Sequence, residues 1–276
     1  MSSENLRGRT AAITGGGDGI GRALALRLAK AGMNLAVLDI RGEAAEATAA
    51  DCGALGVKSC ALSCDVSVPD EITAAAVHAE GELGPISLLW ANAGLRVPGG
   101  LLTASREVLR WMFAVNVDGI IDTARAFVPA MRRHEGWRRI AITASTAGLV
   151  QTASGRSTGY CASKFASVGI AEALRAELAA DSIGVTLFCP GIVNTRIWDG
   201  ERARPERFGG PAFAAEEAGE TWRSTGMDVD QVAEIAVEGV CNDQFYVVLP
   251  GSADGAGRIA RRAEEIRQAV RLLPER

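Results

Sequence analysis

A tyrosine and a lysine lie four residues apart in the segment YCASK, as Tyr160 and Lys164. On a helix, this spacing puts the phenol and the ammonium on one face, about one turn apart. A free tyrosine has a pKa of about 10, and a nearby cation lowers that pKa because it favours the phenolate. The pair could therefore act as a general acid and base, although the same spacing is frequent in ordinary pairs on surface helices.

A glycine-rich turn lies near the start of the chain, where residues 14–21 have the sequence TGGGDGIG. Glycines let backbone N–H groups approach a pyrophosphate closely, and the N-terminus of the following helix attracts the same anion. The turn lies at the first strand–helix junction, where a dinucleotide fold needs it. We therefore expect contacts to a dinucleotide from Gly15, Asp18, Gly19, Ile20 and Gly21.

A carboxylate at the end of the second apolar run favours NAD as the dinucleotide. Asp39 stands 18 residues after Gly21, where a carboxylate accepts hydrogen bonds from the adenosine ribose and repels a 2′-phosphate. Two alternatives remain: Arg41 could turn toward a phosphate, and an aspartate at a strand end is also a common turn residue. Asp18 adds negative charge nearby, so NADP is the less favoured cofactor.

These residues need a scaffold, and the chain alternates short apolar runs with stretches of helical periodicity. The pattern predicts strands at Thr10–Thr14, Asn34–Asp39, Lys58–Asp65, Ile86–Ala91, Arg139–Ala144, Gly184–Cys189 and Gln244–Leu249. It predicts helices at Gly21–Ala31, Glu43–Leu55, Asp70–Glu82, Arg106–Arg133 as one long helix, Gly159–Ala180 and Asp230–Cys241.

Apolar strands that alternate with helices favour a parallel, doubly wound α/β sheet with helices on both faces. No shift in composition marks a linker, so residues 1–276 are expected to form a single domain. A segment of about 196–226 is predicted to be irregular and to serve as a substrate lid. Residues from about 252 to 276 are predicted to form a helical extension whose charges are of mixed sign.

Several motifs occur in the order found in the short-chain dehydrogenase/reductase family, which this sequence resembles over residues 9–195. They are the glycine turn, ANAG at 91–94, Asn116, Ser145, YCASK and Pro190-Gly191. The resemblance implies a single-domain Rossmann fold of about seven strands, an NAD(P) cofactor and a catalytic set of four residues. The implied set is Asn116, Ser145, Tyr160 and Lys164.

The resemblance also implies a role for each of these residues. Tyr160 would exchange the hydroxyl proton, and Lys164 would bind the nicotinamide ribose and lower the pKa of Tyr160. Ser145 would hydrogen-bond the substrate oxygen, and Asn116 would anchor a water in the proton relay. Further contacts to the cofactor are implied for Asp65, Val66, Asn92, Ala93, Gly94, Pro190, Gly191, Ile192 and Thr195.

The spacing between Ser145 and Tyr160 is wider than is usual in that family. We place the extra residues in the loop 151–158, next to the substrate. Ser154 and Ser157 are alternative serines in this loop and are interpreted as turn residues.

Apolar and aromatic side chains in the lid predict a secondary alcohol or ketone substrate with a hydrophobic or aromatic body. The lid and the extension are similar to those of family members that oxidise such alcohols. The lid arginines Arg196, Arg202, Arg204 and Arg207 could meet a carboxylate or lie in solvent, and solvent is the favoured interpretation. Expected substrate contacts are Leu95, Leu149, Gln151 and Trp198.

Composition argues against several other classes of protein. The net charge is −4 and no basic cluster occurs, which disfavours nucleic acid as a partner. The sequence contains no run of eighteen apolar residues, so a membrane span is not expected. The start of the chain lacks an apolar signal region. The six cysteines form no metal-site spacing and are expected to be free thiols in the cytoplasm, with no metal bound.

Two further expectations concern assembly and activity. Extra apolar residues on the helices around 106–133 and 159–180, which build interfaces in the family, predict a homodimer or homotetramer. The alternative function is a nucleotide-sensing binding protein on the same fold with no turnover. It is the less favoured interpretation because every catalytic position is kept.

Overall fold

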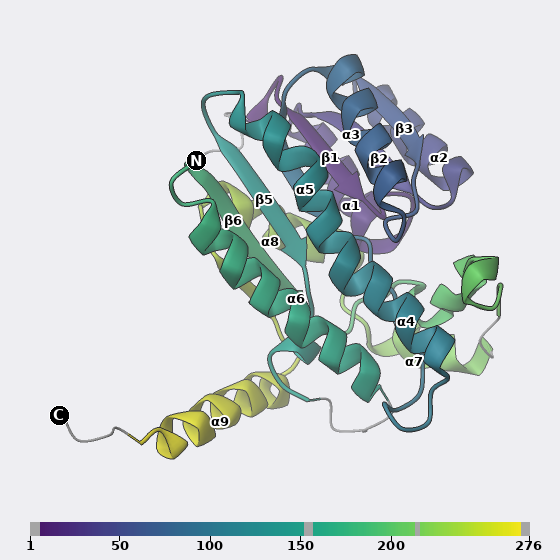
Figure 1. Cartoon of the computed structure of the whole chain (residues 1–276), viewed down its shortest axis with the longest axis vertical. Coiled ribbons are helices and arrows are strands. Elements are labelled where there is room, and N and C mark those ends of the chain that lie inside the picture. The colour runs from purple at the N-terminus through teal and green to yellow at the C-terminus, as the bar shows by residue number, and fades with distance from the viewer. Residues whose placement is uncertain (1–5, 152–156, 213–215, 272–276) are drawn as a thin grey trace.

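Seven parallel strands form one sheet in the order β3-β2-β1-β4-β5-β6-β7 (Figure 1). The computed structural model describes residues 6–151, 157–212 and 216–271. The strands are β1 (Thr10–Thr14), β2 (Asn34–Asp39), β3 (Ser59–Ser63), β4 (Ile86–Ala91), β5 (Arg138–Thr143), β6 (Ile183–Pro190) and β7 (Tyr246–Leu249). This arrangement confirms the predicted doubly wound Rossmann fold.

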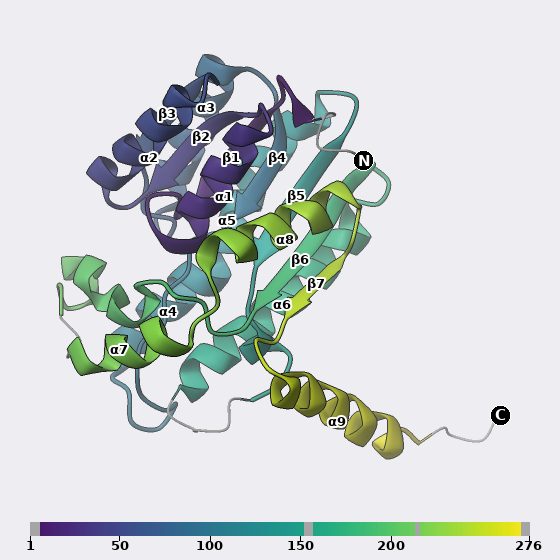
Figure 2. The ribbon, with the colours of Figure 1, turned by 180° about the vertical axis from the view of Figure 1, so that it is seen from behind.

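Helices cover both faces of the sheet, because strands of this kind are apolar on both sides. One face carries α3 (Pro69–Leu83), α5 (Gly119–Arg132) and α6 (Thr158–Glu177), as Figure 1 shows. The other face carries α1 (Gly19–Lys30), α2 (Gly42–Ala54) and α8 (Val229–Cys241), as seen from behind in Figure 2. Side chains of β1 alternate between the two cores: Ala11 and Ile13 pack on the α1 side, and Ala12 packs on the α3 side.

The predicted long helix over 106–133 is present, with a π-helical turn in its middle that the sequence did not predict. It consists of α4 (Arg106–Phe113), a π-helical segment Ala114–Asp118 and α5. Each flank keeps its own helical periodicity, and the π-helical turn between them spans only five residues, so the sequence pattern did not reveal it. The segment carries Asn116 and turns its amide toward the loop after β4.

The lid segment, residues 196–226, is more regular than predicted in its described part. It contains two 3₁₀ segments, Ile197–Ala203 and Glu206–Phe208, and the helix α7 (Glu216–Thr225). Arg204 stabilises the turns by donating to the Gly210 carbonyl at 2.6 Å and to Glu201 at 2.9 Å. Such short-range contacts produce no apolar periodicity, so the sequence indicated only an irregular segment.

A last helix, α9 (Ala253–Ala269), extends away from the body of the molecule (Figure 2). Its charged residues are of mixed sign, and most of its side chains are exposed. Among the residues that the structure describes, no helix combines the length and the apolar character needed to cross a membrane.

Candidate active site

A pocket with a volume of about 560 Å³ opens at the carboxyl ends of the strands. This is where open α/β sheets bind their ligands, and the volume suits a small molecule or cofactor. Almost all of the expected catalytic and cofactor residues line it. They are Gly15, Asp18, Gly19, Ile20, Gly21, Asp39, Asp65, Val66, Asn92, Ala93, Gly94, Ser145, Tyr160, Lys164, Pro190, Gly191, Ile192 and Thr195.

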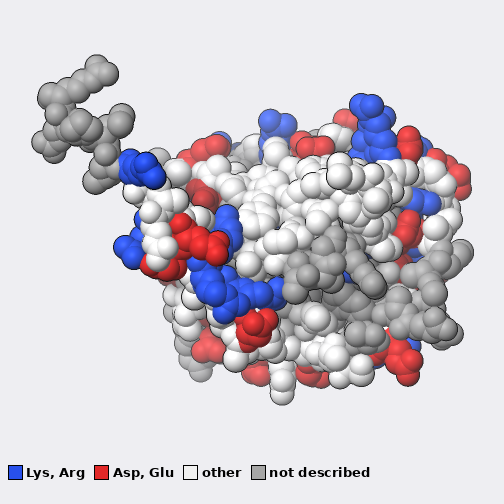
Figure 3. Space-filling model, turned by 90° about the horizontal axis from the view of Figure 1, so that it is seen from below, with Lys and Arg blue, Asp and Glu red and all other residues white. Residues whose placement is uncertain are grey.

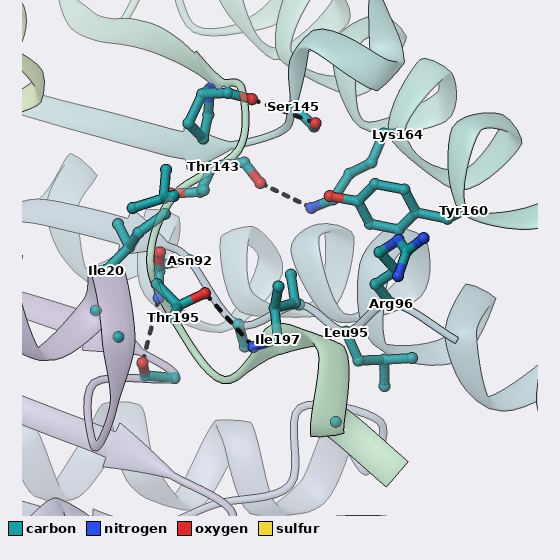
Figure 4. Close-up of a pocket in the computed structure, with 18 of the residues that line it drawn as sticks. Ile20, Asn92, Leu95, Arg96, Thr143, Ser145, Tyr160, Lys164, Thr195 and Ile197 are labelled. Atoms are coloured by element: carbon teal, nitrogen blue, oxygen red, sulfur yellow. Dashed lines mark hydrogen bonds between the residues drawn. The ribbon is translucent and has the colours of Figure 1, made fainter. Parts of the chain in front are cut away.

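Helix α6 and the end of β5 bring three reactive side chains to this pocket. Tyr160 and Lys164 are both buried on α6, and the Lys164 Nζ lies 5.9 Å from the centre of the Tyr160 ring. Lys164 Nζ donates a hydrogen bond to the Thr143 carbonyl at 3.0 Å, which orients the ammonium. Ser145 follows β5 and is also buried, and its Oγ donates to the Pro190 carbonyl at 3.3 Å (Figure 4).

Burial has the largest effect on the pKa values of Tyr160 and Lys164. It raises the pKa of Tyr160 above its ordinary value, and a hydrogen bond with Ser145 and the charge of Arg96 oppose that rise. Burial also lowers the pKa of Lys164 to about 8, because the charged ammonium is desolvated. Arg96 is therefore a cation that favours the phenolate in this structure, beside Lys164, for which the resemblance implies the same effect.

Asn116 is fully buried and does not line the pocket. Its Oδ1 accepts from the Leu95 N–H at 2.9 Å, and its Nδ2 donates to the Leu95 carbonyl at 2.9 Å and to Ser163 Oγ at 3.0 Å. Its backbone carbonyl accepts from Ser167 Oγ at 3.0 Å. The side chain therefore connects the loop after β4 to α6 and sets the position of the pocket wall.

The glycine turn forms a close-fitting cradle for an anion. A Cβ on Gly21 would lie 1.9 Å from the Gly15 carbonyl oxygen, so the backbone approach is possible only for glycine. Asn92 supports the turn, because its Nδ2 donates to the Thr14 carbonyl at 3.1 Å and to the Gly15 carbonyl at 3.2 Å. Asp18 caps α1 by accepting from the Gly19 N–H at 2.7 Å, so α1 starts two residues earlier than predicted. These features fit a dinucleotide.

The Asp39 carboxylate is buried beside this turn and is oriented by backbone donors. Oδ2 accepts from the Gly17 N–H at 2.9 Å, and Oδ1 accepts from the Arg41 N–H at 3.0 Å. The Arg41 guanidinium points to Asp18, at 3.2 Å, and its Nε is 3.8 Å from Asp39. A negative charge is thus held at the end of β2, with one arginine close to it.

Two arginines of the lid segment reach across to the cofactor half of the pocket. Arg202 donates to Asp18 Oδ2 at 2.9 Å, and Arg207 donates to Asp65 Oδ2 at 2.6 Å and to Ser67 Oγ at 2.7 Å. The interpretation as solvated was wrong for Arg202, whose side chain is 16% exposed, whereas Arg207 is 45% exposed and binds a carboxylate as well. Their carboxylate partners lie more than a hundred residues earlier in the chain, and no local sequence signal identifies them.

Of the expected substrate contacts, Leu95 lines the pocket and three others do not. Leu149 packs against the core, and Gln151 is exposed with its carbonyl accepting from Arg258 at 3.4 Å. Trp198 packs against the backbone of α7 at Gly219. Apolar walls come instead from residues that the sequence did not single out, among them Trp111, Val115, Ala147 and Ile197.

The widened loop between Ser145 and Tyr160 meets the pocket at Ser157. Ser157 is buried, lines the pocket and accepts a hydrogen bond from Arg96 Nη2 at 2.6 Å. Ser154, the other alternative serine, lies outside the described residues. Arg96 itself lines the pocket, and sequence reasoning missed it; its place directly after ANAGL was the available signal.

The surface around the carboxyl ends of the strands carries no single sign of charge. Figure 3, seen from below the view of Figure 1, shows basic and acidic groups beside a broad uncharged area. A field of mixed sign does not select ligands over long distances. Selection therefore depends on individual groups inside the pocket.

Comparisons with known proteins agree with this geometry. A family model described as short chain dehydrogenase matches residues 9–206. The 1-deoxy-11-beta-hydroxypentalenate dehydrogenase of Streptomyces exfoliatus is 34% identical over 272 residues, covering 98% of this chain and 92% of that protein. Human estradiol 17-beta-dehydrogenase 11 is 32% identical over 252 residues, covering 90% and 77%.

Solved structures give the same result. A short-chain dehydrogenase/reductase from Burkholderia phymatum, determined in complex with NAD, is 31% identical to this chain. It superposes with a TM-score of 0.88 and covers 100% of both chains. NAD is therefore supported as the cofactor of this fold.

Proposed function

This chain belongs to the short-chain dehydrogenase/reductase family, and from that premise we propose that it transfers hydride between NAD(H) and a secondary alcohol or ketone with a hydrophobic body. One observation carries the proposal: Ser145, Tyr160 and Lys164 converge on the same pocket as the glycine turn. A dinucleotide in the cradle and an alcohol at the phenol would therefore share one enclosed space.

In this proposal Tyr160 is the acid and base of the reaction. When an alcohol is oxidised, its O–H proton passes to the Tyr160 oxygen as its C–H hydrogen leaves as hydride. When a ketone is reduced, the phenol returns that proton to the oxygen. The bound nicotinamide supplies or accepts the hydride. Since burial raises the pKa of Tyr160, the free enzyme holds the phenol protonated at neutral pH, ready to donate.

Ser145 and Lys164 position the reacting groups. The Ser145 hydroxyl lies at the pocket wall next to Tyr160 and would hydrogen-bond the substrate oxygen. Lys164 is held by the Thr143 carbonyl and would donate to the nicotinamide ribose. Asn116 acts through the backbone of Leu95 and is a positioning residue.

Asp39 supports a preference for NAD over NADP. Its carboxylate is already oriented at the end of β2, where a 2′-phosphate would meet a negative charge. The adjacent Arg41 interacts with Asp18 and Asp39, so its charge is partly offset.

The substrate proposal rests on the apolar walls of the pocket. Leu95, Trp111, Val115 and Ile197 line it beside Tyr160. The two relatives described above are named for activity on a hydroxypentalenate and on estradiol. These names agree with an alcohol on an apolar body.

The test is a panel of secondary alcohols and ketones, assayed by NADH absorbance with NAD and NADP in parallel. We expect turnover of hydrophobic members with NAD. Tyr160→Phe should lower kcat by about 10²–10⁴-fold, the usual contribution of a general acid and base. Binding of NADH, followed by its fluorescence, should change little because the cradle is untouched.

Two results would count against the proposal. A preference for small polar polyols would contradict the substrate class. Absence of turnover across the whole panel, with tight NADH binding in both proteins, would favour the nucleotide-sensing alternative.

A further inference from the structure

The lid segment begins beside the glycine turn, and one of its arginines enters the pocket there. A Cβ on Gly19 would lie 3.1 Å from Thr195 Cγ2, so the residue before the lid segment packs on the start of α1. Arg202 follows in the 3₁₀ segment Ile197–Ala203, is largely buried and lines the pocket together with the glycine turn. The cradle for a dinucleotide therefore has a cation of the lid segment at its edge.

Asp18 holds two arginines at the start of α1. Its Oδ2 accepts from Arg202 Nη2 at 2.9 Å and from Arg41 Nη2 at 3.2 Å, while its Oδ1 accepts from the Gly19 N–H at 2.7 Å. A phosphate at the N-terminus of a helix binds the same kinds of donor, which are backbone N–H groups and guanidinium groups. The Asp18 carboxylate therefore makes the contacts that an anion would make at this end of α1.

The ion pairs of Arg202 do not fully offset the effects that disfavour its charge. Burial lowers the pKa of its guanidinium, the charges of Arg41 and Arg196 lower it further, and Asp18 and Asp199 oppose this change. Both aspartates are shared: Asp18 also binds Arg41, and Asp199 lies 2.8 Å from Arg196 and 3.9 Å from Arg202. A further anion beside Arg202 would stabilise its positive charge.

Arg202 also has a donor that is not used within the protein. Its Nη1 donates to the backbone carbonyls of Arg196 at 3.1 Å and Asp199 at 2.7 Å, which fixes the plane of the guanidinium. Among the residues that the structure describes, its Nε is buried and makes no hydrogen bond. A buried donor without an acceptor is costly, and an acceptor brought by a ligand of this pocket would remove that cost.

We propose that Arg202 binds the pyrophosphate of the dinucleotide, exchanging its ion pair with Asp18 for one with the ligand. Arginine is well suited to this contact because its planar donors match the oxygens of a phosphate. The inference rests on the proposed function, since it takes the binding of a dinucleotide as its premise. It gives the lid segment a direct contact with the cofactor, in addition to the contacts of the glycine turn.

The experiment compares two ligands that differ in phosphate. ADP-ribose carries the adenosine and the pyrophosphate, and adenosine carries neither phosphate. Their dissociation constants are measured by competition with NADH, whose fluorescence reports its own binding. Arg202→Gln should raise the dissociation constant of ADP-ribose about tenfold, as expected for the loss of one charge-assisted hydrogen bond, and should leave that of adenosine unchanged.

Asp18→Asn distinguishes a direct contact from an ion pair that only holds the lid segment in place. Asparagine still caps the start of α1, and the charge that competes for Arg202 is removed. A direct contact predicts that ADP-ribose binds several-fold more tightly to Asp18→Asn than to the wild type. The gain should be smaller when Arg202→Gln is also present, because part of it comes from the released arginine.

Arg204→Gln is the matched control in the same segment. Arg204 makes its contacts with Glu201 and Gly210, both inside the lid segment. The dissociation constants of ADP-ribose and adenosine should equal those of the wild type.

Three results would overturn the role of Arg202 and leave the proposed function standing. They are an unchanged affinity of Arg202→Gln for ADP-ribose, an equal loss for ADP-ribose and adenosine, and weaker binding of ADP-ribose by Asp18→Asn. The second and third are the results of a purely structural role. A wild-type protein that binds neither ADP-ribose nor NADH would overturn the proposed function, and this inference with it.

Discussion

The Tyr160 phenol has two neighbouring cations, and burial affects these three groups differently. It raises the pKa of the phenol, lowers the pKa of Lys164 to about 8 and lowers the pKa of Arg96. A guanidinium remains charged at every physiological pH despite such a shift, whereas an ammonium with a pKa of about 8 does not. Near the upper end of the physiological range, the lasting positive charge beside the phenol is therefore that of Arg96.

The lowered pKa of Lys164 predicts a pH-dependent stability. In the unfolded chain lysine has a pKa of about 10.5, so between pH 8 and 10.5 the unfolded state binds a proton that the folded state does not. The free energy of unfolding of the wild type, relative to Lys164→Met, should therefore rise as pH increases through this window. From pH 7 to 9.5 the gain should be about 2 kcal/mol, measured by chemical denaturation.

Lys30→Met provides the control for this measurement, because Lys30 is exposed at the end of α1. Its difference from the wild type, measured over the same range, is the baseline for the comparison. A constant difference for Lys164→Met across the same range would show that the ammonium is not desolvated.

Sequence reasoning at the residue scale identified many of the residues that line the pocket. Their types are dictated by chemistry: a phenol for the proton, glycines for a close backbone approach, and a carboxylate for a ribose. It missed Arg96, Arg202 and Arg207, because an arginine is equally compatible with solvent, an ion pair or a ligand. Only the fold decides among these, by placing a carboxylate or a pocket within reach.

At the scale of elements, the lid segment is joined to the cofactor half of the pocket by two ion pairs. Arg202–Asp18 and Arg207–Asp65 have small exposed fractions on at least one side, so solvent screens them less than ordinary surface pairs. The first lies at the glycine turn and the second near the end of β3. We propose that a dinucleotide bound between them is released only after this part of the lid segment moves.

The double variant Arg202→Gln/Arg207→Gln should therefore release NADH several-fold faster than the wild type, as measured by stopped-flow fluorescence. Each partly buried ion pair contributes on the order of 1 kcal/mol. High salt should accelerate release from the wild type more than from the variant, because ions screen the pairs.

Arg204→Gln is the matched control for the lid. Arg204 makes its contacts inside the lid segment, with Glu201 and Gly210. Its release rate should match that of the wild type. Identical rates in all three proteins would mean that the ion pairs do not hold the lid.

The whole molecule was predictable in outline because the sheet obeys simple rules. Apolar strands that alternate with helices leave few topologies other than a parallel, doubly wound sheet. The observed elements differ from the predicted ones where local side-chain contacts, and not the apolar periodicity of the sequence, determine the backbone. In the π-helical segment, Asn116 bonds to Leu95 and Ser163, and in the lid segment Arg204 bonds to the Gly210 carbonyl. Neither leaves a repeating pattern in the sequence.

We also propose that the chain forms a homodimer or homotetramer through α5 and α6, as the family resemblance implies. Light scattering should give a mass that is a multiple of 28.8 kDa. Ile170 is half-buried on α6, and Ile170→Asp should lower the mass toward that of one chain, because an interface core excludes an unpaired charge. Ile266→Asp, on the exposed face of α9, should leave the mass unchanged.

A wild-type mass near 28.8 kDa at micromolar concentration would contradict this assembly. If Ile170→Asp and Ile266→Asp had the same effect on the mass, the interface would not be formed by α6.

The π-helical segment has a consequence for how this chain can vary in length. A π-helical turn is equivalent to one extra residue in an α-helix, and its removal would rotate α4 by about 100° relative to α5. Trp111 and Met112 on α4 would then leave the core. The stretch 114–118 should therefore tolerate neither an insertion nor a deletion, even where single substitutions are accepted. In a comparison of many related chains, gaps would be absent from this stretch.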